Sequence, residues 1–374
     1  MKILITNEHL EKRAGTQMAV RDLALELRRQ GHVPQVYSPR LGEVAEEIAK
    51  GGIEVTSRLD TLSQSPDVIH GHHHSQVVQA LLQFPGIPAV LVCHAAKPWV
   101  EEPFYHPRIL RYVAVDEACR QRIESTPKIP RERIEVIWNA VDLPRFRRRE
   151  ALPEGPRRAL VFSNYATSAT QLPPLRKACR RAGVKLDVVG LMAGTAVAAP
   201  EHVLPSYDLV FAKGRCALEA LAVGNAVVLC DYGGAGELVT TANLDRVRSM
   251  TFGGDALAGP LDASYITAQI EHYNARDAAA VCDRIRAEAG LDQMIHRWLG
   301  LYENVIQEFQ KAPRDYDQEF LALGAYLEKW SYAGRVEWER AQFKTLSGTP
   351  LIGGAMVALA RRLLRKLTGN YGLS

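Results

Sequence analysis

The segment YDLVFAKGRCALEALAVGNAVVLCDYGGAGELVT, residues 207–240, decides the fold class of this chain. Its apolar runs at 209–212 and 226–231 predict two buried β-strands, because continuous Val- and Leu-rich runs are typical of parallel strands that are covered on both faces. Residues 214–223, between these runs, have a helical pattern. A strand, a helix and a second strand make a βαβ unit, so the segment indicates a parallel sheet.

The same alternation of apolar runs and helical patterns extends over most of the chain. It predicts an α/β fold with two Rossmann-like, doubly wound parallel-sheet domains that face a cleft. The other strands are expected at residues 2–6, 33–37, 53–55, 68–70, 89–93, 112–115, 134–137, 159–163 and 186–190. The other helices are expected at 16–30, 43–50, 76–83, 117–124 and 173–182.

A proline-rich, charged stretch near residues 144–158 is typical of a linker. We therefore expect an N-terminal domain at 1–145, a linker at 146–157, a second domain at 158–312 and a helical tail at 313–374.

Composition excludes several classes of protein. With 374 residues, 47% of them hydrophobic, and a formal net charge of +4, the chain is neither disordered, collagen-like nor basic enough to predict a nucleic-acid partner. The apolar run at the amino terminus spans five residues, too short for a signal-peptide core, so a cytoplasmic location is expected. The six widely spaced cysteines are expected to be reduced, and they are Cys93, Cys119, Cys179, Cys216, Cys230 and Cys282.

Chemistry is expected beyond the carboxyl ends of the strands, where ligands of such sheets bind. In residues 207–240, Lys213 and Arg215 begin a helix whose amino terminus favours a diphosphate, and Glu219 can accept hydrogen bonds from a ribose diol. Gly233 and Gly234 belong to an expected glycine-rich loop. Alternatively, the two cations are solvated and Glu219 belongs to a surface ion pair.

Gly15 and Thr16 stand before the first helix and are candidates for binding an anion. A simple helix cap explains them equally, since the spacing matches neither a dinucleotide fingerprint nor a P-loop.

Histidines gather after two strands of the first half. The run DVIHGHHH places His70 at the end of a strand and His72, His73 and His74 in the loop that follows, which is expected to be polar and to face the cleft. No Cys or carboxylate lies at ligand spacing to make a zinc site. No metal is therefore expected. His94 ends the next strand and either contacts a substrate hydroxyl or is a buried structural histidine.

Taken together, the chain resembles the GT-B glycosyltransferases of family 4 over residues 1 to about 310. AGTQMAVRDLALELRRQGHVPQVYSP is similar to the family's first loop and helix, and YVAVDEACRQRI resembles a further strand and helix. VIWNAVDLPRF resembles the family's "VIPNGVD…RF", with Asn139 in register, and ALEALAVGNAVVLCDYGGAGELV resembles its donor site.

The resemblance implies transfer of a hexose-type sugar from a nucleotide-sugar to a glycan, lipid or other acceptor with retention of configuration, without metal or cofactor. It implies a role in making a polysaccharide or glycolipid from the cytosolic side. Glu219 would hold the ribose, and His94 would contact the transferred sugar. The expected catalytic residues are His94, Lys213 and Arg215. The expected donor-binding residues are Gly15, Thr16, Asn139, Lys213, Arg215, Glu219, Gly233 and Gly234.

Two departures from the family pattern keep alternatives open. The first glutamate of the family's paired motif falls on Phe211, and the Arg and Lys expected after residues 159–163 are absent before Arg176. Our hypothesis is that Lys213 and Arg215 supply the positive charge instead. The alternatives are a GT-B protein that binds a nucleotide or glycan without transfer, and a sugar-nucleotide epimerase of the same fold.

The tail has its own signal. Helices are expected at 291–311, which either closes the second domain or crosses back to the first, and at 318–329. Residues 350–367 combine an apolar run too short to span a bilayer with four cations. From residue 345 onward there is no acid, so this segment holds the whole charge excess. It is expected to lie on an anionic membrane surface or to pack on protein. The oligomeric state is not predicted.

Overall fold

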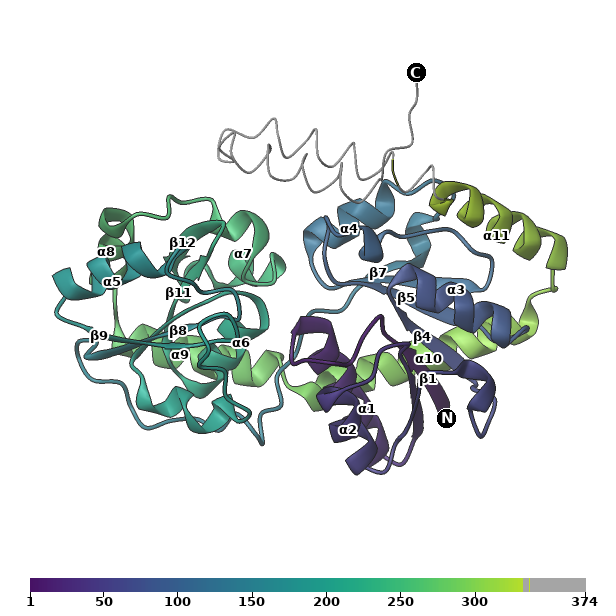
Figure 1. The fold of residues 1–374 in the computed structure, drawn as a ribbon, viewed down its shortest axis with the longest axis horizontal. Helices are drawn as coiled ribbons and strands as arrows, with labels where there is room; N and C mark the ends of the chain where they lie inside the picture. Colours follow the sequence, from purple (N-terminus) through teal and green to yellow (C-terminus); the bar gives the residue numbers. More distant parts are fainter. Residues whose placement is uncertain (332–335, 337–374) are drawn as a thin grey trace, which may run out of the picture. The chain divides into compact units, whose positions relative to one another are not determined.

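The computed structural model describes residues 1–331 and 336. Met1–Arg314 form one compact unit and Asp315–Ser374 belong to a second (Figure 1). The division of the first unit at a linker of residues 146–157 stays a prediction.

The first sheet of the larger unit is parallel throughout and has seven strands in the order β3-β2-β1-β4-β5-β6-β7. Its strands are β1 (Lys2–Thr6), β2 (Val33–Tyr37), β3 (Glu54–Thr56), β4 (Val68–His72), β5 (Ala89–Cys93), β6 (Ile109–Ala114) and β7 (Ile134–Val136). Its helices are α1 (Gly15–Arg29), α2 (Glu43–Lys50), α3 (His74–Gln83) and α4 (Glu117–Glu124). The strand order reverses between β1 and β4, and this reversal opens a crevice at the carboxyl ends of the strands.

The second sheet has five strands in the order β12-β11-β10-β8-β9, of which only β12 runs antiparallel. Its strands are β8 (Arg158–Phe162), β9 (Lys185–Val189), β10 (Leu209–Ala212), β11 (Ala226–Asp231) and β12 (Gly234–Leu238). The helices of this region are α5 (Leu172–Arg181), α6 (Gly214–Val223), α7 (Leu244–Ser249), α8 (Ala263–Glu271) and α9 (Ala275–Glu288). Two doubly wound α/β regions are thus confirmed.

Strand β12 corrects the expectation of a loop at the glycine-rich segment. A Cβ atom on Gly234 would lie 2.2 Å from the carbonyl oxygen of Leu257, and one on Gly236 would lie 2.2 Å from that of Ala256. The glycines are therefore needed because the backbone of this edge strand lies close to a neighbouring segment, and they do not mark a loop.

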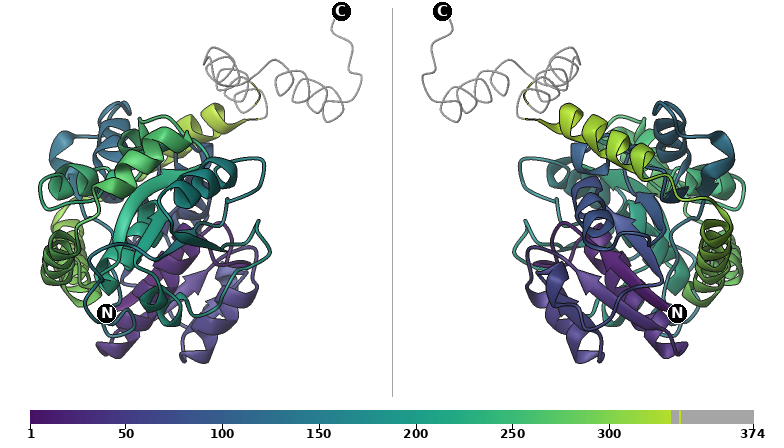
Figure 2. Two further views of the ribbon diagram at one scale, coloured as in Figure 1. Left: turned by 90° about the vertical axis from the view of Figure 1, so that its left-hand side faces the viewer. Right: turned by 90° about the vertical axis from the view of Figure 1, so that its right-hand side faces the viewer.

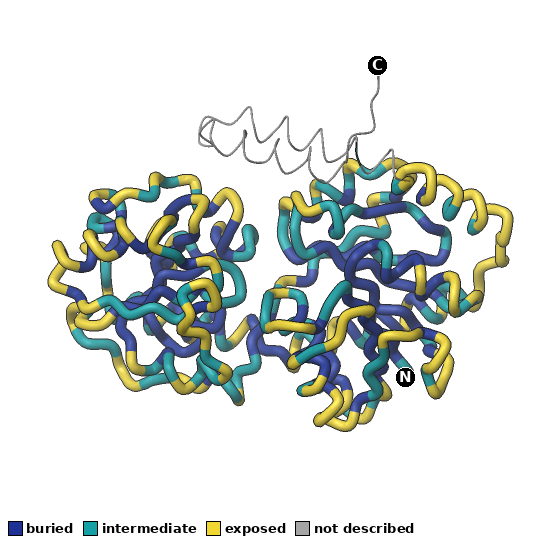
Figure 3. The backbone as a smooth tube through the Cα atoms, viewed as in Figure 1, coloured by how far each residue is buried: buried dark blue, intermediate teal, exposed yellow. Residues whose placement is uncertain are grey.

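Two apolar cores cover the faces of the second sheet. Val210 and Ala212 belong to one core and Leu209 and Phe211 to the other, because successive strand residues point to opposite faces. Figure 3 shows the strands as mostly buried segments. Phe211, where the resemblance led us to expect a glutamate, has no exposed surface and is part of the core.

Helix α10 (Leu291–Lys311) crosses back to the first sheet, where it packs on α1, β4, β5 and β6. In the right-hand view of Figure 2 it appears as the light-green helix beside the purple and blue strands. Trp298 and Tyr302 are buried on it, and the Tyr302 hydroxyl lies 2.6 Å from Nδ1 of His70. Of the two expected courses for residues 291–311, crossing back is confirmed.

The second unit contains α11 (Tyr316–Trp330), which the sequence predicted at 318–329. The Asp315 side chain caps it by accepting a hydrogen bond from the main chain of Gln318 at 3.0 Å. The cationic segment at 350–367 lies outside the described residues. Within the described part of the chain, no helix has the length and apolar character needed to cross a bilayer.

Candidate functional site

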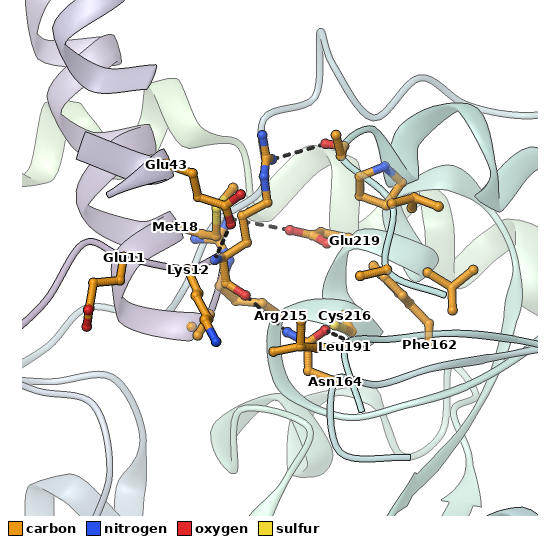
Figure 4. A pocket seen from close by; sticks show the side chains of 18 of the residues that line it. Glu11, Lys12, Met18, Glu43, Phe162, Asn164, Leu191, Arg215, Cys216 and Glu219 are labelled. Carbon is orange, nitrogen blue, oxygen red and sulfur yellow. Dashed lines mark hydrogen bonds and ion pairs between the residues drawn. The ribbon is translucent and has the colours of Figure 1, made fainter. Parts of the chain in front are cut away.

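A cavity of about 590 Å³ lies where the strand-end argument predicted chemistry. One wall comes from the first region, with residues 11–15 leading into α1, and from Arg145. The facing wall comes from the ends of β8 and β9 and from the first turns of α6 (Figure 4). Its size suits a small organic ligand.

Glu219 lies on the α6 wall of this cavity and is 9% exposed. Burial raises the pKa of this carboxyl above its ordinary value, and the nearby Asp22 raises it further, while Arg215 opposes both. A buried carboxylate at a cavity wall can accept hydrogen bonds from ligand hydroxyls, and the expected ribose contact stays a prediction.

Arg215 also lines the cavity, but its charge is already paired. Its Nη2 donates to Oδ2 of Asp22 at 2.5 Å and to Oε1 of Glu219 at 3.4 Å. Burial alone would lower the pKa of Arg215, and these two carboxylates raise it above the ordinary value. The guanidinium is therefore positioned beside the cavity as part of a balanced cluster.

Asp22, on α1, is the residue that balances Arg215, and sequence reasoning missed it. Arg21 donates to the Oδ1 atom of Asp22 from Nε at 3.0 Å and from Nη2 at 2.6 Å. Burial would raise the pKa of Asp22, but the two guanidinium groups hold it below the ordinary value. The only sequence signal was an acid on the first helix. Its partner, Arg215, could not be inferred because it is almost two hundred residues away.

Lys213 stands apart from the cavity, whose lining does not include it. Its ammonium forms an ion pair with Asp231, which is 1% exposed. The hypothesis that Lys213 and Arg215 supply charge to a diphosphate stays a prediction, and in the structure both cations have carboxylate partners.

The start of α1 brings Gly15 into the cavity wall, whereas Thr16 is not part of the lining. Ala14 occupies the cap position with no side-chain cap, and the first turn contains no acid. The helix amino terminus therefore keeps its partial positive charge for a ligand.

Three expected donor residues lie elsewhere. Asn139 borders a separate cavity of about 10 Å³ with Gly214 and Phe252. Gly233 is exposed, and Gly234 is part of β12. The structure does not bring these residues to the wall that holds Glu219, so their roles stay predictions.

The histidines after β4 do not form the polar loop that the sequence predicted. Strand β4 continues to His72 and α3 begins at His74, so that His73, with φ of 62°, is the whole connection. All of them are buried, because the sheet extends further than its apolar pattern. Burial lowers the pKa of His70 to about 3, so its ring is neutral. Among residues 1–331 and 336, no group of histidine, cysteine and acid side chains has the geometry of a metal site.

His94 lies in a network that fixes both its ring and its backbone. Its Nε2 is 2.6 Å from Nδ1 of His72, and its main-chain N–H donates to Oε2 of Glu101 at 2.9 Å. His73 Nδ1 accepts from the main chain of Glu8 at 3.0 Å, which leaves Nε2 to donate toward Oε1 of Glu101 at 3.5 Å. Burial lowers the pKa of His94, and Glu101 opposes that shift.

Two further polar residues at the cavity were not predicted. Arg145, which the sequence placed at the end of the first domain, lines the cavity and pairs with Glu201 at 2.8 Å. Asn164, directly after β8, accepts from the main chain of Leu191 at 3.2 Å and donates to the carbonyl of Arg13 at 3.1 Å. Its place at a strand end was the available signal.

Comparisons with known proteins agree with this architecture. Residues 13–145 match Glycosyltransferase Family 4, a shorter range than the expected resemblance over residues 1 to about 310. No curated protein matches the chain.

Among solved structures, a glycosyltransferase from Rickettsia africae is similar with a TM-score of 0.60 and 14% identity, over 82% of this chain and 98% of that one. Anabaena HepE, solved with UDP and glucose, has a TM-score of 0.54 and 15% identity, over 81% and 100%. A putative UDP-N-acetylglucosamine 2-epimerase from Listeria monocytogenes has a TM-score of 0.50 and 12% identity, over 84% and 98%. The chain therefore has the GT-B fold.

Proposed function

We propose that this protein is a glycosyltransferase that moves a hexose-type sugar from a nucleotide-sugar donor to a glycan or lipid acceptor with retention of configuration. The observation that carries the proposal is the cavity itself, which places Gly15 at one helix amino terminus opposite Arg215 and Glu219 of α6. The match of residues 13–145 to family 4 supports the same reaction class.

In this proposal Glu219 accepts hydrogen bonds from the ribose hydroxyls of the donor. The uncapped amino terminus of α1 faces the diphosphate, where its dipole and free N–H groups stabilise negative charge. Arg215 contributes by exchanging part of its interaction with Asp22 for one with phosphate oxygens, while His94 contacts the transferred sugar. The leaving diphosphate, stabilised in this way, takes up the proton of the acceptor hydroxyl as the new glycosidic bond forms, so no separate carboxylate base is needed.

The competing proposal is a GT-B protein that binds a nucleotide or glycan without transfer. It is favoured by Phe211, which is fully buried where the family has a glutamate, and by the carboxylate partners of Lys213 and Arg215. A sugar-nucleotide epimerase is the remaining alternative.

The experiment is a thermal-shift screen of a panel of nucleotide-sugars, followed by a turnover assay with the best binder and candidate acceptors. Transfer or donor hydrolysis supports the enzyme, and binding without turnover supports the binding protein. Exchange of isotope at the sugar carbon would reveal an epimerase.

A matched pair of variants connects the result to the cavity. Glu219→Gln keeps the shape of the side chain but removes its charge, and it should weaken nucleotide binding about tenfold if the carboxylate accepts two ribose hydroxyls. Glu303→Gln, an exposed change on α10, should leave binding unchanged. Equal affinity in all three proteins would remove Glu219 from the donor site.

We also propose a location on the cytosolic side of a membrane, where the cationic segment at 350–367 meets anionic lipid. Replacing its cations by glutamine should abolish co-sedimentation with phosphatidylglycerol vesicles, and the changed residues are Arg361, Arg362, Arg365 and Lys366. Phosphatidylcholine vesicles are the control. Unchanged co-sedimentation would exclude an electrostatic membrane role.

A further inference from the structure

A tyrosine–lysine row, formed by Tyr165, Lys213 and Tyr232, crosses the carboxyl edge of the second sheet. The three residues follow β8, β10 and β11, which are neighbours in the order β11-β10-β8. Because these strands are parallel, their carboxyl ends meet at one edge. The topology therefore places the lysine between two aromatic rings that are far apart in sequence.

The centre of the row is held in place. The Lys213 ammonium pairs with Asp231, whose carboxylate is buried and accepts from the Ser163 hydroxyl at 3.5 Å. The same ammonium lies 5.7 Å from the ring centre of Tyr165 and 5.3 Å from that of Tyr232. Cation–π attraction and the ion pair thus orient both rings around a group that is itself anchored.

The two rings remain open to solvent. Tyr165 is 50% exposed and Tyr232 is 57% exposed, and their centres are 5.9 Å apart in an edge-to-face arrangement. Neither phenol hydroxyl has a hydrogen-bond partner among residues 1–331 and 336. Aromatic rings that are gathered at the edge of a sheet and left uncovered offer a ligand an apolar face and a polar hydroxyl group.

We propose that the tyrosine–lysine row binds the neutral pyranose ring of the donor. The C–H faces of a pyranose pack on aromatic rings, and the ring hydroxyls find partners in the two phenols and the Lys213–Asp231 pair. Because Asp231 balances the charge of Lys213, the surface favours a neutral sugar over an anionic one. This inference rests on the proposed function.

The position of the tyrosine–lysine row relative to the cavity favours the sugar of the donor, rather than a separate glycan, as its ligand. Asn164, directly before Tyr165, lines the cavity, and so does Arg215, two residues after Lys213. A nucleotide in the cavity would therefore present its sugar within one or two residues of the row along both segments.

The test compares a nucleotide with and without its sugar. In calorimetry, the wild type should bind UDP-glucose, or the best nucleotide-hexose of the screen, more tightly than the matching nucleoside diphosphate. The Tyr165→Ala/Tyr232→Ala double variant should lose that advantage by about tenfold while binding the diphosphate as before. Tyr316→Ala, a change at a tyrosine that is 51% exposed on α11, is the matched control.

The phenylalanine variants separate stacking from hydrogen bonding. Tyr165→Phe/Tyr232→Phe should keep most of the advantage, since the rings remain. If the double alanine variant is folded and retains the full sugar-dependent advantage, the inference is overturned although the proposed function stands.

A second measurement covers the case in which no nucleotide binds, which would contradict the proposed function. Saturation-transfer NMR with free glucose, galactose, mannose and N-acetylglucosamine should then still show transfer to ring C–H protons in the wild type and none in the double alanine variant. Absence of transfer from the wild type to any of these sugars would overturn the inference as well.

Discussion

The carboxyl edges of the two sheets differ in the residues that form them and in how far those residues are buried. At the first-sheet edge, defined by His72, His73, His94 and Glu101, polar groups are largely buried and bond to one another. At the second-sheet edge, Tyr165 and Tyr232 are half exposed.

The difference teaches what each edge can do. A buried network whose donors and acceptors are mostly used internally is suited to hold one side chain, His94, in a fixed orientation. An open aromatic surface beside a cavity is suited to receive a ligand. Variants of the residues that hold His94 should therefore act mainly on stability, and variants at the second edge mainly on binding.

The largest effect on stability is expected from Glu101→Ala. It leaves the main-chain N–H of His94 and the ring of His73 without their acceptor in a buried setting, and should lower the free energy of unfolding by about 3 kcal/mol. Urea unfolding measures this.

The matched control is Glu117→Ala, on α4, where an exposed pair with Arg120 is removed. It should cost less than about 1 kcal/mol. Equal losses for the two variants would mean that the first-sheet edge is not held by Glu101.

Asp22→Asn tests the ion pair that joins α1 to α6 beside the cavity. It removes half of a buried ion pair and should lower the free energy of unfolding by about 2 kcal/mol, yet it releases Arg215 toward the cavity. Affinity for a nucleoside diphosphate should then rise severalfold. Asp60→Asn, at an exposed pair with Arg58, is the control for both measurements. A variant that loses stability without gaining affinity would remove Arg215 from the diphosphate site.

Tyr302→Phe should have a smaller effect. It deletes one hydroxyl that lies 2.6 Å from Nδ1 of His70 in a fully buried position, at a cost of about 1 to 2 kcal/mol in the free energy of unfolding. Tyr232→Phe, on a ring that is 57% exposed, should leave the free energy of unfolding unchanged. Unchanged stability in Tyr302→Phe would mean that the contact between Tyr302 and His70 does not help to hold α10 on the first sheet.

The smallest effect on stability is expected from Glu219→Gln, and this effect depends on pH. The pKa of Glu219 is raised in the folded protein, so its ionised form costs stability above that pKa, and the cost disappears as pH falls through it. The variant should therefore melt on the order of 1–2 °C higher than the wild type at neutral pH. The difference should vanish in acid.

Thermal melts of Glu219→Gln, Glu303→Gln and the wild type at several pH values make that comparison. If Glu219→Gln melts at a lower temperature than the wild type at neutral pH, the ionised carboxylate stabilises the fold, and the prediction is wrong.

The sequence predicted the fold well where hydrophobic pattern alone decides it. The strands β1, β2, β5, β10 and β11 have the predicted bounds, because their residues are almost all buried and, except in β2, almost all apolar. It was wrong at β12, where glycines are required by close backbone contact, and at His72 to His74, where buried strand and helix residues replace the expected polar loop.

The candidate site was predicted less completely. Gly15, Arg215 and Glu219 meet at one cavity as strand-end reasoning suggested, since topology fixes where strand ends lie. The ion pairs of Arg215 with Asp22 and of Lys213 with Asp231 could not be read, because pairing depends on side-chain positions and not on spacing.

Helix α10 has a consequence for how the protein is made. During synthesis, β1 to β7 leave the ribosome long before Leu291–Lys311, the segment that covers one face of β4, β5 and β6. Until then that face is uncovered, and Tyr302 is not available to His70. The first half of the chain is therefore expected to complete its fold late, and to depend on chaperones in the interval.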